Sequence, residues 1–188
     1  TACELGYVSQ TDGEAFCTVC EQGTYANATS TTCLDCEPGF ACSLGIRTRC
    51  GTGELSKAKQ ATCQACKPGE VPFGLSCKKC APGTSAPFEA ASCTTCGLGY
   101  VSQTDGEAFC TVCEQGTYAD ANSTTCFDCE PGYACSAGVK EPCEAGKVAE
   151  AKQPTCQACS PGEVPNEQSC EACSAGTSAA FQEVSCTS

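Results

Sequence analysis

Large apolar side chains are sparse along this chain and occur singly or in pairs. An aromatic or aliphatic residue often stands one or two positions after a glycine, and a polar stretch rich in Ser, Thr, Asn and Ala then runs to the next cysteine. Examples are Tyr7, Tyr25, Phe40, Leu55 and Val71. Short apolar segments between turn residues are typical of β-hairpins. The pattern predicts small disulfide-rich modules in tandem, elongated and irregular, with short β-hairpins and almost no helix.

The glycines in this pattern stand three positions after a cysteine. We call each stretch that begins with such a C-x2-G motif a module, and the chain contains twelve modules. A glycine next to a bridge most simply supplies a positive φ in a tight turn, which the motif therefore predicts. The module glycines are Gly6, Gly23, Gly39, Gly53, Gly69, Gly83, Gly99, Gly116, Gly132, Gly146, Gly162 and Gly176.

Cysteine occupies the same positions twice, 93 residues apart. The first set is Cys3, Cys17, Cys20, Cys33, Cys36, Cys42, Cys50, Cys63, Cys66, Cys77, Cys80 and Cys93. The second is Cys96, Cys110, Cys113, Cys126, Cys129, Cys135, Cys143, Cys156, Cys159, Cys170, Cys173 and Cys186. A fixed period indicates stacked modules whose contacts run mainly between sequence neighbours. It divides the chain into two cysteine-rich repeats of six modules, residues 1–93 and 94–188.

The first parts of the two repeats are more similar to each other than the second parts are. Residues 1–42 match residues 94–135 at 36 of 42 positions, whereas residues 43–93 match residues 136–186 at 27 of 51. The cysteines and module glycines are the same in both repeats, whereas every residue of 46–49 differs. We therefore interpret the spacing of cysteine and glycine as what determines the fold, and the remaining side chains as interchangeable. Both ends of the chain fall inside a C-x2-C step, which predicts a window on a longer array.

Disulfide bonding is the simplest role for the 24 cysteines. Each module can close on itself, as in Cys3–Cys17, Cys20–Cys33, Cys66–Cys77 and Cys80–Cys93. Cys36, Cys42, Cys50 and Cys63 pair either as 36–42 with 50–63 or as 36–50 with 42–63, and similar loop length favours the first. Zinc knuckles fit poorly, because His is absent and each repeat would need three zinc ions. A thioredoxin-like role lacks the βαβ pattern that it requires.

Composition explains why bridges are needed and where the chain belongs. Leu, Ile, Val and Phe total 23 of 188 residues, and Trp and Met are absent, so apolar burial cannot offset the conformational entropy of folding. A bridge closing a loop of about 15 residues contributes roughly 3 kcal/mol in the chain-entropy model. We expect a rod larger than a compact domain of this length, whose radius of gyration is roughly 16 Å. Disulfides predict an extracellular or cell-surface location.

Charge and chemistry exclude several classes of function. A net charge of −12 opposes binding to nucleic acid and to anionic membranes, and no apolar stretch is long enough for a membrane segment. Without His, the commonest general base and the Ser–His and Cys–His pairs are missing. The carboxylates Asp12, Glu14, Glu21 and Glu37 are scattered. We therefore expect no catalytic residues, no cofactor and no metal, and predict that the chain is not an enzyme.

Two N-x-[ST] sequons predict N-linked glycans at Asn27 and Asn122. The first repeat has Asn27 where the second has Asp120, and the second has Asn122 where the first has Thr29. Each repeat thus carries one sequon in the same loop, two residues out of register. Polar loop filler is the alternative interpretation.

The run Cys33-Leu-Asp-Cys36-Glu-Pro-Gly-Phe-Ala-Cys42 and its copy from Cys126 to Cys135 resemble the ephrin-receptor-like cysteine-rich repeat. The wider pattern is similar to tumour-necrosis-factor-receptor-like modules. Families of this kind include receptor ectodomains, surface coats of unicellular eukaryotes and subunits of algal flagellar hairs of the mastigoneme type. The close 93-residue reiteration departs from the receptor versions.

From these patterns the chain is expected to be a structural repeat segment of an extracellular filament or cell-surface layer, disulfide-rigidified and glycosylated. The alternative is a protein-binding receptor or adhesin ectodomain. The expected partners are other copies of the chain or a filament partner protein, with side-to-side contacts through Phe73, Phe88 and Phe181.

Overall fold

The structure is a computed structural model that describes residues 3–9, 11, 16–166 and 168–188. Throughout these residues it contains no helix, and its strands are two or four residues long. Each strand pairs with its neighbour in sequence, so the sheets are two-stranded antiparallel hairpins. The predicted fold class of tandem disulfide-rich hairpin modules is confirmed.

The strands of the two periods correspond one to one over most of their length. In the first period they are β1 Tyr7–Val8, β2 Thr18–Val19, β3 Thr24–Tyr25, β4 Leu34–Asp35, β5 Phe40–Ser43, β6 Ile46–Arg49, β7 Glu54–Leu55, β8 Gln64–Ala65, β9 Glu70–Phe73, β10 Ser76–Lys79 and β11 Thr84–Ser85. From there follow β12 Thr94–Thr95, β13 Tyr100–Val101, β14 Thr111–Val112, β15 Thr117–Tyr118, β16 Phe127–Asp128, β17 Tyr133–Ser136, β18 Val139–Pro142, β19 Lys147–Val148, β20 Gln157–Ala158, β21 Glu163–Asn166 and β22 Ser169–Ala172.

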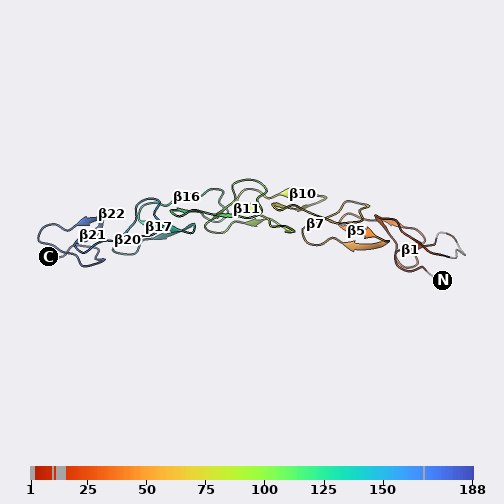
Figure 1. The fold of residues 1–188 in the computed structure, drawn as a ribbon, viewed down its shortest axis with the longest axis horizontal. Coiled ribbons are helices and arrows are strands. Elements are labelled where there is room, and N and C mark those ends of the chain that lie inside the picture. Colours follow the sequence, from red (N-terminus) through yellow and green to blue (C-terminus); the bar gives the residue numbers. More distant parts are fainter. Residues whose placement is uncertain (1–2, 10, 12–15, 167) are drawn as a thin grey trace. The chain divides into compact units, whose positions relative to one another are not determined.

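By its internal contacts the chain divides into two compact units. One comprises residues 1–80, 86–94 and 106–108, and the other comprises residues 81–85, 95–105 and 109–188. Within each unit the hairpins follow one another in chain order, as β1, β5, β7 and β10 do in the first (Figure 1).

Every module closes on itself through one disulfide. The bridges are Cys3–Cys17, Cys20–Cys33, Cys36–Cys42, Cys50–Cys63, Cys66–Cys77 and Cys80–Cys93, followed by Cys96–Cys110, Cys113–Cys126, Cys129–Cys135, Cys143–Cys156, Cys159–Cys170 and Cys173–Cys186. Of the two arrangements open for the four irregular cysteines, the structure has 36–42 with 50–63. No described cysteine is free.

The interior consists of sulfur and small side chains. The largest fully buried side chains are those of cysteines such as Cys36, Cys42 and Cys80, together with Ser102. Typical clusters join one valine, one cysteine and one alanine, and the cluster around Val8 reappears around Val101. Apolar burial of this size is too small to hold the chain folded, so the bridges carry the stability that a core supplies elsewhere.

The module glycines all adopt the predicted positive φ, between 75° and 90°. Their peptide groups also join successive modules. The Gly23 N–H donates to the Cys42 carbonyl at 2.9 Å, and the Gly23 carbonyl accepts from the Cys36 N–H at 2.9 Å. The same pair of bonds recurs at Gly39, where the partners are Ser56 and Cys50. We call this pair of backbone bonds the glycine clasp.

Some backbone contacts join a module to the second module after it. The sequence pattern predicted contacts mainly between neighbouring modules. A Cβ atom placed on Gly53 would lie 2.3 Å from the carbonyl oxygen of Glu89, two modules further along. Glu89 itself has a φ of 61°. The same contact pairs Gly23 with Lys59, Gly116 with Lys152 and Gly146 with Gln182. At these positions glycine is therefore required for space as well as for its φ angle.

Candidate functional site

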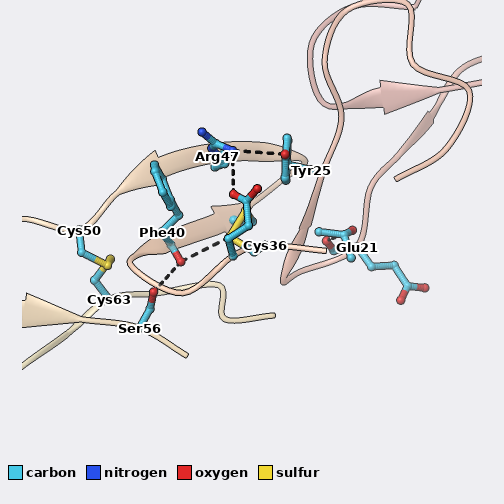
Figure 2. Close-up of a disulfide and its surroundings, with 11 residues drawn as sticks. Glu21, Tyr25, Cys36, Phe40, Arg47, Cys50, Ser56 and Cys63 are labelled. Carbon is cyan, nitrogen blue, oxygen red and sulfur yellow. Dashed lines mark hydrogen bonds and ion pairs between the residues drawn. A yellow bond between two sulfur atoms is a disulfide. The ribbon is translucent and has the colours of Figure 1, made fainter. Parts of the chain in front are cut away.

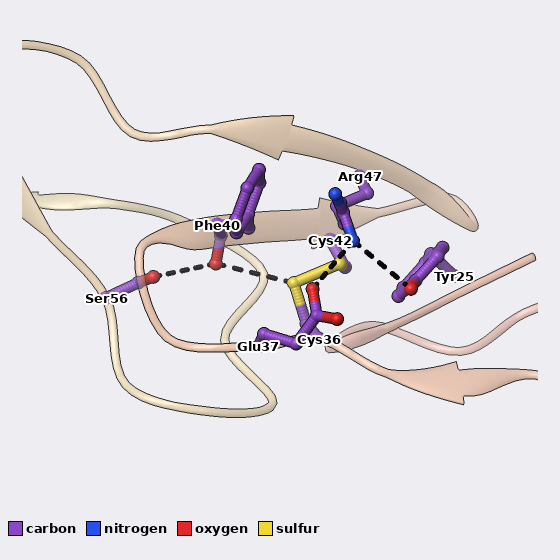
Figure 3. A network of polar contacts seen from close by, with 7 residues as sticks. All are labelled: Tyr25, Cys36, Glu37, Phe40, Cys42, Arg47 and Ser56. Carbon is purple, nitrogen blue, oxygen red and sulfur yellow. Dashed lines mark hydrogen bonds and ion pairs between the residues drawn. A yellow bond between two sulfur atoms is a disulfide. The ribbon is translucent and has the colours of Figure 1, made fainter.

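A cluster of aromatic and acidic side chains surrounds Arg47 on β6. Its Nη1 donates to Glu37 Oε2 at 2.7 Å and to the Tyr25 hydroxyl at 3.3 Å. The guanidinium carbon lies 4.2 Å from the centroid of the Phe40 ring and 5.2 Å from that of Tyr25. A cation over an aromatic face is attracted by the ring quadrupole. Figure 3 shows Arg47 held between Glu37 and Tyr25.

The Arg47 cluster covers a disulfide. Arg47 stands opposite Cys42 in the β5–β6 hairpin, and the Cys36–Cys42 bridge beneath it is fully buried. Ser56 Oγ donates a 2.7 Å hydrogen bond to the Phe40 carbonyl (Figure 2). Cys36 Sγ lies 3.4 Å from the same oxygen, but a disulfide sulfur carries no proton, so this is a contact and not a hydrogen bond.

The second period rebuilds the cluster with different residues. Lys140 on β18 replaces Arg47, pairs with Glu130, and places its Nζ 4.2 Å from the Tyr133 ring centroid and 4.9 Å from that of Tyr118. Residues 46–49 had been interpreted as interchangeable, but the structure shows that one basic side chain among them has a defined role in both periods. A basic residue seven positions after the aromatic of the C-x2-G motif was the signal available in the sequence.

The charge pair in the second-period cluster perturbs the titration of both partners. The hydrogen bond from Lys140 lowers the pKa of the Glu130 carboxyl below its ordinary value, and the same bond raises the pKa of Lys140. Each cation is already surrounded by a carboxylate and aromatic rings. We therefore interpret the two clusters, around Arg47 and Lys140, as structural contacts that cover buried disulfides, and we call them pins.

The pKa shifts predict a pH dependence of stability. Glu130 contributes stability above the unfolded pKa of about 4.3, and this contribution is lost as the pH falls through the lower folded pKa. Lys140 contributes below about pH 10.4, and its contribution is lost as the pH rises through the higher folded pKa. Lys140→Met should raise the pH at the midpoint of the Glu130 titration, followed by the NMR signal of its carboxyl carbon. An unchanged midpoint would show that the pair is not formed in solution.

Both sequons lie on the surface, but in different backbone settings. Asn27 is exposed just after β3, beside an open depression of about 260 Å³ lined by Leu5, Tyr25, Ile46 and Arg47. Asn122 is exposed and has a φ of 65°, with its N–H donating to the Cys96 carbonyl at 2.8 Å. Asparagine tolerates a left-handed backbone better than most residues, so position 122 favours it for reasons independent of a glycan.

We predict carbohydrate on both asparagines in material from the native source. Glycosidase release in heavy-oxygen water should convert Asn27 and Asn122 to labelled Asp, which peptide mapping detects. Asn166, which lies outside any sequon, is the internal control and should stay unlabelled. Unmodified Asn at both sequons would overturn the prediction and leave the backbone explanation for Asn122.

The phenylalanines expected at side-to-side contacts are exposed, but they do not all repeat. Phe88 and Phe181 occupy equivalent positions and are exposed by 58% and 61%. Phe73 is exposed too, but its copy is Asn166, so it cannot make a contact in every period. Phe16 and Phe109, which the sequence analysis did not single out, are the most exposed aromatics that the structure describes, at 85% and 71%.

The carboxylates named in the sequence analysis lie in separate surroundings in the part of the chain that the structure describes. Glu37 is engaged by Arg47, and the Glu21 carbonyl accepts from Thr24. Asp12 and Glu14 lie outside the described residues. No group of three metal-ligating side chains occurs among the described residues.

Two surface depressions at equivalent positions differ between the two periods. A depression of about 250 Å³ beside Leu55 and Lys57 corresponds to one of about 410 Å³ beside Val148 and Glu150. The basic side chain of the first is replaced by an acidic one in the second. A repeated ligand site would keep its charge, so these depressions do not define one.

The hairpins, bridges and clasps together define a cysteine-rich repeat protein, a class whose dense disulfides fit an extracellular setting. No described helix has the length and apolar character needed to cross a membrane. Neither a family model nor a curated protein matches this chain.

Proposed function

We propose that the chain is a structural repeat segment of an extracellular filament or cell-surface layer, built on the plan of ephrin-receptor-like modules. The observation that carries this proposal is which features of the chain are the same in both periods and which are not. Bridges, positive-φ glycines, clasps and pins recur in both periods, whereas 24 of the 51 residues in 43–93 differ from their copies in 136–186. A backbone framework that stays constant while many side chains around it vary suits a spacer. Such a spacer must keep its structure under mechanical load and resist proteolysis.

The receptor or adhesin alternative requires a surface that recognises one partner. The exposed pair Phe88 and Phe181 is a repeated feature that could serve it, but the depressions change charge between periods. The side chains that line these depressions therefore differ between the periods. This favours the structural role.

Immunogold electron microscopy of the native source tests the proposal. An antibody against an exposed segment of the chain should label polymers or a continuous coat, and the chain should remain in the detergent-insoluble fraction until a reductant is added. Antibody to an unrelated secreted protein serves as the control. Labelling confined to dispersed, membrane-anchored molecules would instead support a receptor.

A further inference from the structure

Basic side chains are confined to two parts of this chain. The ten Lys and Arg residues lie within residues 47–79 and 140–152, whereas carboxylates occur along the whole sequence. Residues 1–46 contain six acidic side chains and residues 80–139 contain seven, and neither stretch contains a basic one. The net charge of −12 therefore does not describe every part of the chain, and positive surface can occur only in the two short stretches.

Some basic residues make ion pairs that recur in both periods. The cations of the two pins are one such case. Lys59 is another, because its Nζ lies 3.0 Å from Asp35 Oδ2, and in the second period Lys152 Nζ lies 2.9 Å from Asp128 Oδ2. At these two positions a cation with a carboxylate partner in the chain stays basic from one period to the next.

Five other cations of the first period show the opposite pattern. All five are exposed, and none makes an ion pair with any residue that the structure describes. They are Arg49, Lys57, Lys67, Lys78 and Lys79, and their copies in the second period are Pro142, Glu150, Ser160, Glu171 and Ala172. The same hairpins form in the second period without these cations. The five charges are therefore not needed for the fold.

Corresponding segments of the two periods consequently differ in sign. Residues 49–79, which we call the basic segment, contain six basic and two acidic side chains. Residues 142–172, the acidic segment, contain two basic and five acidic side chains. The hairpins of the two segments have the same lengths and the same register. The two segments thus place opposite charges on matching backbone frameworks.

The acidic segment contains a depression that suits a basic side chain. This is the depression of about 410 Å³ described above, which is lined by Glu150 and Glu163 and by no Lys or Arg. Glu163 Oε2 accepts a 3.2 Å hydrogen bond from the Ser160 N–H, and neither carboxylate pairs with a cation among the described residues. The corresponding depression in the basic segment is lined by Lys57 and by no carboxylate.

We propose that the basic segment of one molecule binds the acidic segment of a second copy of this chain. Both segments expose the charges that the contact needs, and each copy has one segment of each sign, so the contact can continue from copy to copy. Near 0.15 M ionic strength the Debye length is about 8 Å. Charges in contact then attract, while acidic stretches that lie further apart are largely screened from one another. The inference deepens the structural role proposed above and rests on it.

An acidic polymer such as a polyanionic polysaccharide is a poorer partner for the basic segment. The stretches that flank it in sequence, residues 1–46 and 80–139, have no basic side chain and would repel such a polymer. A second copy of the chain instead offers an acidic surface of the same extent as the basic segment. This is why we assign the contact to a second copy.

Charge-reversed variants of the oxidised 188-residue chain test the contact. Lys57→Glu with Lys78→Glu introduces the residues that the second period has at these positions, and Glu150→Lys with Glu171→Lys does the converse. Each framework already occurs with both kinds of side chain, so both variants should fold. In sedimentation equilibrium, each variant alone should have an association constant at least about tenfold below that of the unmodified chain, the equivalent of about 1.4 kcal/mol. An equimolar mixture of the two should restore association, because each variant then meets the opposite charge.

A matched variant controls for the net charge. Glu21→Lys with Glu114→Lys changes two exposed residues outside both segments and adds the same positive charge as Glu150→Lys with Glu171→Lys. If net repulsion alone governed association, both of these variants would associate more strongly than the unmodified chain. The proposed contact predicts that association becomes stronger only in the Glu21/Glu114 variant. Equal behaviour of the two variants would overturn the proposal.

Two further results would also reject this contact. One is an unmodified chain that stays monomeric at every concentration measured. The other is binding of dextran sulfate to the basic segment without self-association, which would assign that segment to an acidic polymer. Neither result decides the structural role, because a filament can form through other surfaces. Immunogold labelling of native material tests that role separately.

Discussion

Reduction of the disulfides should unfold this protein completely at 25 °C without any denaturant. Each bridge between cysteines 13 residues apart, such as Cys50–Cys63, contributes roughly 3 kcal/mol. The net stability of a folded domain is only about 5–15 kcal/mol, so loss of a handful of bridges already exceeds it. The interior of single valines, alanines and cysteines supplies too little apolar burial to compensate.

The measurement is the amide NMR spectrum, with trypsin digestion of the same samples. The fully reduced and alkylated chain should lose its dispersed signals and become cleavable at its Lys and Arg residues, which lie within residues 47–79 and 140–152, while the oxidised chain in the same buffer resists. Stepwise reduction sharpens the test, because fully buried bridges such as Cys36–Cys42 should react after the more exposed Cys3–Cys17. A dispersed spectrum after complete alkylation would show that a core other than the bridges holds the fold.

Gly53→Ala should destabilise its module far more than the corresponding change at Gly39. Both glycines have positive φ, 75° and 84°, so alanine costs about 1–2 kcal/mol of backbone strain at either site. At Gly53 the added methyl group would also lie 2.3 Å from the Glu89 carbonyl oxygen, whereas at Gly39 nothing lies within 4 Å. Forcing the two modules apart should add about 1–3 kcal/mol at Gly53 alone.

Amide hydrogen exchange reads out the two substitutions at matched positions. The Cys66 N–H donates to the Gly53 carbonyl, and the Cys50 N–H donates to the Gly39 carbonyl, each at 3.0 Å. Exchange at Cys66 should therefore accelerate more in Gly53→Ala than exchange at Cys50 does in Gly39→Ala. Equal acceleration would mean that the contact with Glu89 is absent in solution and that only φ strain matters.

The Arg47 cluster shows where prediction from the sequence was limited. Its aromatic members could be found one by one after the module glycines, and Glu37 is plainly visible in the sequence. What could not be predicted is that the antiparallel register places Arg47 opposite Cys42, above a buried bridge. A position where Arg becomes Lys and the flanking residues change looks interchangeable until the contacts of the cation are known.

The sequence by itself determined the properties that depend on neighbours along the chain. Each bridge joins cysteines of one module, and the φ of a C-x2-G glycine is set within a single turn, so spacing alone was enough to predict hairpins, turns and most of the pairing. Only the tertiary structure decided between the two arrangements of Cys36, Cys42, Cys50 and Cys63, because loop length discriminates weakly between closures. It also decided the contact between Gly53 and Glu89. That contact joins backbone atoms of modules that are not adjacent in sequence. Because every residue has the same backbone groups, no pattern of side chains in the sequence predicts such a contact.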